Sequence, residues 1–123
     1  MIQKYVFDTN ALLYALAQGV KIEKNLHSIS VITEMELLSY PKLTLQDEVT
    51  LRGVLSFFQC IELTTEIKQQ AIWFRRNTGL KLPDSIVAAT AFMSNQILLT
   101  SDKKLLNTPH IKAVSFEQIY VSE

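Results

Sequence analysis

Four acidic residues stand at positions from which carboxylates could share one metal ion: Asp8, Glu36, Asp84 and Asp102. No histidine-rich or thiol ligand set accompanies them, because the chain has only two histidines and one cysteine. Carboxylates that lie within a few ångströms of one another repel and raise each other's pKa unless a cation is present. Ligand sets made only of oxygen favour Mg²⁺ or Mn²⁺ over zinc, and such ions commonly serve phosphoryl chemistry. The residue types therefore point first to phosphodiester hydrolysis.

Each acid has a competing structural interpretation. An aspartate at a helix start accepts a backbone N–H and suits the helix dipole, which applies to Asp8, Asp84 and Asp102 taken singly. Thr33 and Glu36 have the spacing of a capping box, in which the two side chains satisfy each other's backbone. Capping does not explain why the acids gather at equivalent positions of the predicted fold.

The elements that would position these acids alternate along the chain. Short apolar runs predict strands at residues 5–7, 29–32, 60–63 and 97–100, with a weaker one at 113–116. Helical spacing and capping residues predict helices at 11–18, from Thr33 to Pro41, at 45–58, from Thr64 to about 77–79, at 84–95 and at 102–106. Strands separated by helices favour parallel pairing, and hence a three-layer α/β/α domain.

Ligands in such a sheet bind at the carboxyl ends of the strands. Asp8 follows the first predicted strand, Glu36 lies in the first turn of the helix after the second, and Asp102 follows the fourth. Asp84 opens a helix that runs back toward the start of the fourth strand, which places it at the same edge. We therefore expect all four carboxylates to converge.

Composition limits the possible classes of protein. The 123 residues are 48% hydrophobic and 20% charged, which is typical of one folded domain, here taken as residues 1–123. Twelve Lys and Arg balance twelve Asp and Glu, which argues against a binder that holds nucleic acid by bulk charge. A single cysteine, no leader-like start and no membrane-length apolar run lead us to expect a cytoplasmic protein without a membrane segment.

Four segments, in order, resemble those of the PIN-domain ribonucleases, and within them the VapC-type toxins of toxin–antitoxin pairs. They are "VFDTNALLYAL" around Asp8, "SVITEMELL" around Glu36, "GLKLPDSIVAATA" around Asp84 and "LLTSDKKL" around Asp102. The resemblance covers nearly the whole chain. Any one segment would be weak, but four in the right order are specific.

The resemblance implies a PIN-like domain with a parallel sheet of about five strands. It implies Mg²⁺ or Mn²⁺ held by the acids, with Asp8, Glu36 and Asp84 essential to catalysis and Asp102 a direct or water-mediated ligand. The implied activity is hydrolysis of single-stranded or looped RNA, and the implied partners are a second copy of the chain, as a homodimer, and a small antitoxin protein.

Other polar residues near the acids are secondary candidates. Hydroxyl and amide groups beside Asp8 and Asp102 could hold carboxylates or waters, or merely form caps and turns: Thr9, Asn10, Thr100 and Ser101. Basic residues could steer an RNA backbone, or simply form solvated helix faces: Arg75, Arg76, Lys81, Lys103 and Lys104. Trp73 could stack a base, although packing within the core or a dimer is the commoner role of such residues.

Two other α/β enzyme classes fit less well. A haloacid-dehalogenase phosphatase needs a second Asp two residues after the first, where this chain has Asn10, and a response-regulator receiver needs acids that "CIELTTE" does not offer. A non-catalytic PIN-like module that binds RNA or protein, and a housekeeping RNA-processing nuclease, remain open. Direct attack by water is expected, because no Ser–His, Cys–His or His–His pair is apparent for another route.

Overall fold

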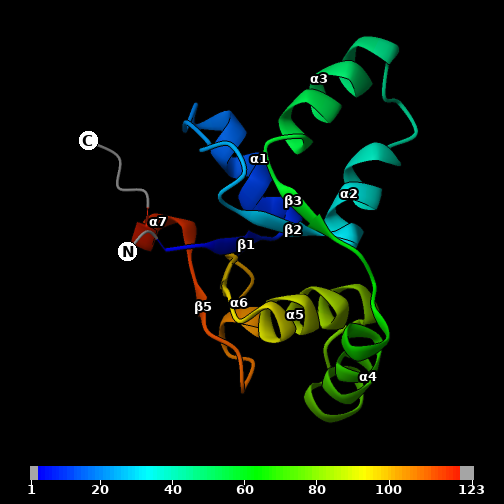
Figure 1. Ribbon diagram of the computed structural model, residues 1–123, viewed down its shortest axis with the longest axis vertical. Coiled ribbons are helices and arrows are strands. Elements are labelled where there is room, and N and C mark those ends of the chain that lie inside the picture. Colours follow the sequence, from blue (N-terminus) through cyan, green and yellow to red (C-terminus); the bar gives the residue numbers. More distant parts are fainter. Residues whose placement is uncertain (1–2, 120–123) are drawn as a thin grey trace.

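The computed structural model describes residues 3–119, and in this part of the chain five strands form one parallel sheet (Figure 1). The strands are β1 (Tyr5–Phe7), β2 (Ser28–Ser30), β3 (Gln59–Ile61), β4 (Ile97–Leu99) and β5 (Ala113–Val114). Their order across the sheet is β3-β2-β1-β4-β5, and every neighbouring pair is parallel. The predicted α/β fold class is confirmed.

Helices cover both faces of this sheet. They are α1 (Thr9–Ala17), α2 (Val31–Leu38), α3 (Leu45–Leu55), α4 (Thr65–Thr78), α5 (Leu82–Ser94), α6 (Lys103–Leu106) and α7 (Phe116–Ile119). Figure 1 shows α1, α2 and α3 on one side of the strands, with α4 and α5 on the other. Within residues 3–119, every helix is too short or too polar to span a lipid bilayer.

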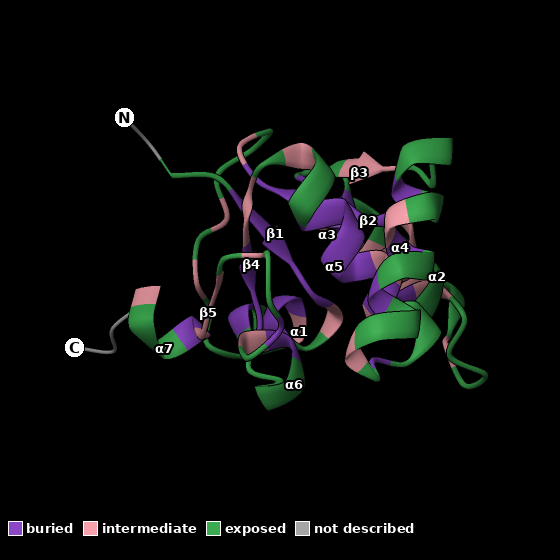
Figure 2. Ribbon diagram, turned by 90° about the horizontal axis from the view of Figure 1, so that it is seen from below, coloured by how far each residue is buried: buried purple, intermediate pink, exposed green. Residues whose placement is uncertain are grey.

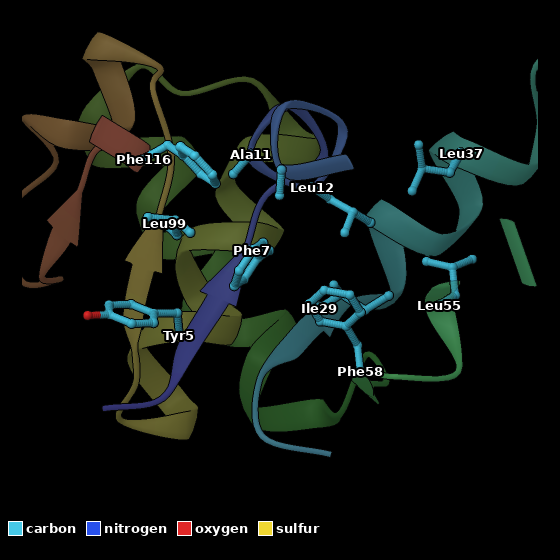
Figure 3. Close-up of a cluster of buried hydrophobic side chains, with 11 residues drawn as sticks. Tyr5, Phe7, Ala11, Leu12, Ile29, Leu37, Leu55, Phe58, Leu99 and Phe116 are labelled. Atoms are coloured by element: carbon cyan, nitrogen blue, oxygen red, sulfur yellow. The ribbon is translucent and has the colours of Figure 1, made fainter. Parts of the chain in front are cut away.

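The two layers follow from the alternation of side chains along the strands. Phe7 points into a cluster with Leu12 and Ile29 on the α1 side (Figure 3), whereas its neighbour Val6 packs on the other side with Phe74. All of β1 is buried, as Figure 2 shows, because it lies in the middle of the sheet and is covered on both faces. Asp8 thus comes at the end of a fully buried central strand.

The boundary between β2 and α2 differs from the prediction. The second strand ends at Ser30 rather than Ile32, and Ser30 caps α2 by accepting the backbone N–H of Ile32. Thr33 is therefore a buried residue inside the helix and not its cap. The β-branched pair Val31 and Ile32 favours a strand by local propensity, but the serine cap and packing turn it into the first turn of α2.

Other boundaries shift by a few residues. α1 begins at Thr9, two residues early, because Asp8 caps it; α3 ends at Leu55 rather than 58; and α2 stops at Leu38, before Pro41. The weak last strand is limited to Ala113–Val114, because Phe116 is the first residue of α7. Its side chain is buried in the core. The order of the predicted elements is otherwise unchanged, but α7 was not predicted and follows the last strand.

Candidate active site

The direction of the chain across the sheet reverses beside β1. β2 and β3 lie on one side of β1, whereas β4 and β5 lie on the other, so the switch point falls between β1 and β4. In open parallel sheets this point leaves a crevice outside the carboxyl ends of the strands. Asp8 directly follows β1 and Asp102 lies just after β4, so both stand at this crevice.

The structure places all four predicted acids around one cavity of about 390 Å³, hereafter the acidic cavity. Two further lining residues, Thr9 and Asn10, come from the start of α1, and Ser39 and Tyr40 come from the end of α2. The complete lining is Asp8, Thr9, Asn10, Glu36, Ser39, Tyr40, Asp84, Val87, Asp102 and Leu105. Residues from four separate parts of the chain therefore meet here, and most of them are polar.

Asp8 is held at the cavity by both of its carboxylate oxygens. Oδ1 accepts the backbone N–H of Ala11 at 2.7 Å, which caps α1, and Oδ2 accepts the hydroxyl of Thr100. Thr100 in turn accepts the backbone N–H of Asp102 at 3.0 Å. The capping interpretation of Asp8 is therefore correct but incomplete, because this residue, only 7% exposed, also lines the cavity.

Glu36 lies in the second turn of α2 and is not part of a capping box. Its Oε1 accepts the hydroxyl of Thr9 at 2.5 Å, and Thr9 Oγ1 lies 3.2 Å from Thr33 Oγ1. Since a carboxylate only accepts and Thr9 has a single hydroxyl proton, Thr33 donates to Thr9. This chain of hydroxyls holds the Glu36 carboxylate at the acidic cavity.

Asp84 and Asp102 occupy different kinds of helix start. Asp84 is the third residue of α5, whose N-cap, Lys81, makes no side-chain capping bond, so capping does not occupy the Asp84 carboxylate. Asp102 does cap α6: its Oδ1 accepts the backbone N–H groups of Lys104 at 2.8 Å and Leu105 at 3.3 Å. Both side chains nevertheless line the acidic cavity.

The carboxylates interact electrostatically. Burial raises the pKa of Asp8 above 3.8, and the charges of Asp102 and Asp84 add to this, while hydrogen bonds from Thr100 and Ala11 oppose it. Burial also raises the pKa of Asp84, with help from Asp102 and Glu36, against the opposing charges of Lys81 and Lys104. Asp84 therefore feels the negative charge of the acids on both sides of the cavity, which is the situation that a bound cation relieves.

The PIN domain family model matches residues 5–111, which is most of the chain and spans all four acids. The chain belongs to the PIN domain family. Comparison with curated proteins gives no match.

Solved structures agree with this assignment. The PIN domain is 30% identical to a chain of a toxin–antitoxin complex from Klebsiella pneumoniae, with 91% of this chain and 97% of that chain covered and a TM-score of 0.74. DNA-bound VapBC from Salmonella typhimurium superposes with a TM-score of 0.78 at 18% identity, covering 94% and 99% of the two chains. VapBC2 from Rickettsia felis, bound to a promoter DNA fragment, gives 0.76 at 19% identity over 92% and 98%. At these two lower identities the similarity shows the fold alone.

The donor set of this PIN domain suits a hard divalent cation. Among residues 3–119, no three His, Cys, Asp or Glu side chains are already arranged as a ligand group for an ion. Mg²⁺ does not require such a cage, because it usually keeps several waters and binds through one or two carboxylates together with substrate phosphate oxygens. Asp8 and Asp84 could serve in that role, because burial raises the pKa of both and the charge of Asp84 adds to the rise at Asp8.

Sequence reasoning missed part of the PIN domain's cavity wall. Ser39 and Tyr40 line it at the point where α2 ends, after Leu38. Thr100 and Ser101, by contrast, are not part of the cavity lining, although the next residue, Asp102, is. Of the basic candidates, Lys81 and Lys104 act on Asp84 by charge, whereas Arg75 and Arg76 lie in the last turn of α4 and not in the cavity lining.

The histidines and the cysteine of the PIN domain have other surroundings. His27 is buried between the rings of Tyr5 and Phe7, its Nδ1 accepts the Tyr5 backbone N–H at 3.2 Å, and burial lowers its pKa. Cys60 is half-buried, and burial raises the pKa of its thiol to about 12. Neither group has the character of a nucleophile or base at neutral pH.

Proposed function

We propose that this PIN domain is a metal-dependent endoribonuclease that hydrolyses RNA phosphodiester bonds and serves as the toxin of a toxin–antitoxin pair. The observation that carries the nuclease part is the acidic cavity, where Asp8, Glu36, Asp84 and Asp102 meet at the switch point of the sheet. Four carboxylates repel the phosphate of an RNA, so they favour catalysis only together with a cation. The toxin part is supported by the 30% identity to a chain of a toxin–antitoxin complex.

The roles of the side chains follow from their surroundings. Asp8 and Asp84 would hold Mg²⁺ or Mn²⁺, which supplies positive charge for the phosphate and lowers the pKa of bound water. Glu36, whose carboxylate accepts from Thr9, and Asp102, whose carboxylate caps α6, would complete the metal shell or accept hydrogen bonds from the attacking water and take its proton. As the new P–O bond forms, the bond from phosphorus to the 3′-oxygen breaks, and that oxygen takes a proton from solvent.

RNA incubated with the purified protein and Mn²⁺ or Mg²⁺ should be cut internally, and EDTA should abolish the cleavage. Direct water attack predicts 5′-phosphate and 3′-hydroxyl ends, which end-labelling and mass spectrometry of the products distinguish from cyclic phosphates. Structured and unstructured RNAs assayed side by side define the substrate. Undiminished cleavage in EDTA, or cyclic-phosphate ends, would refute the proposed chemistry.

The toxin role predicts two kinds of association, a homodimer and a complex with a small antitoxin. Exposed apolar side chains on α3 and α4 are candidates for such contacts, among them Leu45, which is 85% exposed, and Val49, which is 66% exposed. Light scattering should give the mass of a dimer, and co-expression with a small adjacent reading frame should yield a complex that suppresses RNA cleavage. A monomer at high concentration, with no inhibitory neighbour, would favour a housekeeping nuclease instead.

A further inference from the structure

A second cavity adjoins the acidic one on the other side of α6. It has a volume of about 510 Å³ and lies between the end of α4 and α6 with its following loop; we call it the α6 groove. Its lining comprises Asn77, Thr78, Gly79, Lys103, Lys104, Asn107, Thr108 and Pro109. The lining contains two cations and no acid, the opposite of the acidic cavity.

The helix α6 separates the two cavities and contributes opposite charges to them. Asp102 and Leu105, three residues apart and hence on one side of the helix, line the acidic cavity. Lys103 and Asn107, four residues apart, line the groove, together with Lys104. The positive charge of Lys104 reaches Asp84 and lowers its pKa, so the groove begins next to the candidate metal ligands.

The two lysines are available to an anionic ligand. Both side chains are exposed. Neither forms an ion pair within residues 3–119, where the salt bridge present joins Arg52 and Glu48 of α3. The polar side chains around the lysines are held in place by their own helices: Asn77 donates to the carbonyl of Trp73 at 2.9 Å, and Asn107 to that of Lys103 at 2.9 Å. The groove therefore offers two exposed ammonium groups, while the side-chain amides of Asn77 and Asn107 donate to backbone carbonyls of their own helices.

We propose that the α6 groove binds the RNA strand on one side of the scissile phosphate, with Lys103 and Lys104 neutralising neighbouring backbone phosphates. This inference rests on the proposed function. A strand whose phosphate lies among the acids must continue across the protein surface, and the adjoining groove offers the cations that the acidic cavity lacks. Because contacts to phosphate carry no sequence information, the groove positions RNA without selecting its sequence.

The test measures binding of a fluorescent single-stranded RNA in EDTA, by anisotropy, over a range of salt concentrations. The variant is Lys103→Gln/Lys104→Gln, and the matched control is Lys4→Gln/Lys21→Gln, which removes two exposed lysines at the opposite edge of the sheet. Each phosphate contact on a single strand contributes about 0.7 to the slope of log K against log salt, so the variant should lose about 1.4 in slope and roughly 25-fold in affinity at 0.1 M salt. Lys103→Arg/Lys104→Arg should retain both.

The groove proposal would be refuted if the lysine variant bound RNA with the same affinity as the control variant, or if the wild type did not bind RNA. If the lysines served only the C-terminal dipole of α6, their loss would lower the melting temperature without changing the salt slope, which also refutes the proposal. The outcome is separable from that of the proposed function. If the lysine variant binds RNA more weakly but the wild type does not cleave RNA with any metal ion, the groove proposal stands and the nuclease proposal fails. If the wild type cleaves RNA and the variant binds and cleaves it equally well, the nuclease proposal stands and the groove proposal fails.

Discussion

Replacing Asp8 by asparagine is expected to lower the rate of RNA cleavage about a thousandfold or more while leaving the fold intact. The loss follows because a charged metal ligand disappears, and about 4 kcal/mol of transition-state stabilisation corresponds to a factor of about a thousand. Asparagine nearly preserves the shape of the side chain, and its Oδ1 can still accept the Ala11 N–H that caps α1. The hydroxyl of Thr100, which now donates to Asp8, can rotate to accept from the new amide.

The matched control is Asp47→Asn, because Asp47 is the one aspartate of the chain that lies outside the acidic cavity. It belongs to the capping box of α3, so its replacement also removes a charge from a helix start. Cleavage is measured with Mn²⁺ in excess, and the fold is checked by circular dichroism. If both variants cleave like the wild type, Asp8 is a helix cap only, and the acidic cavity is not the catalytic site.

Mn²⁺ is expected to raise the melting temperature of the wild type by roughly 10 °C at a hundredfold excess over its dissociation constant. Binding to the folded state alone contributes about 2.7 kcal/mol at that concentration, and a domain of this size gains about 4 °C per kcal/mol. Asp84→Asn should lose most of this shift, because it removes a ligand without removing a cap. Asp47→Asn should retain the full shift, whatever its own melting temperature.

Without divalent ions the same carboxylates should give stability the opposite dependence on pH from that of ordinary buried ion pairs. The pKa values of Asp8 and Asp84 are raised on folding, so their contribution to stability is fully present below the unfolded value of 3.8 and is lost as pH rises through the folded values. At neutral pH, Asp84→Asn should therefore melt no lower than the metal-free wild type, and any gain should vanish in acid. Melting curves in EDTA from pH 4 to 8 test this sign. A lower melting temperature of Asp84→Asn than of the metal-free wild type at neutral pH would contradict the raised pKa of Asp84. Calorimetry that detects no Mn²⁺ binding to the wild type at millimolar concentration would instead remove the metal from the proposed mechanism.

Consecutive residues determine some elements of this fold, whereas packing between distant segments determines others. β1, the helix that Thr64 caps and the Gly79 that ends it were predicted within a residue, because their signals lie in consecutive positions. The predicted start of α2 was wrong, because Val31 and Ile32 have the propensity of a strand. The Ser30 cap and the packing of α2 on the sheet place both residues in a helix instead. Propensity decides an element where the surrounding fold does not compete with it.

The order of strands and helices along the sequence was enough to place Asp8, Glu36, Asp84 and Asp102 on one edge, because a parallel sheet with right-handed crossovers brings every strand end to the same side. Their roles as ligands and catalysts remain predictions. The tertiary structure alone decided how these acids are held: the bond between Thr9 and Glu36 joins residues 27 positions apart, and that between Thr100 and Asp8 joins residues 92 apart. It also decided that Lys103 and Lys104 face the end of α4 across a groove. Such contacts depend on how helices rotate and pack against the sheet, which is set by the whole core and by no local run of residues.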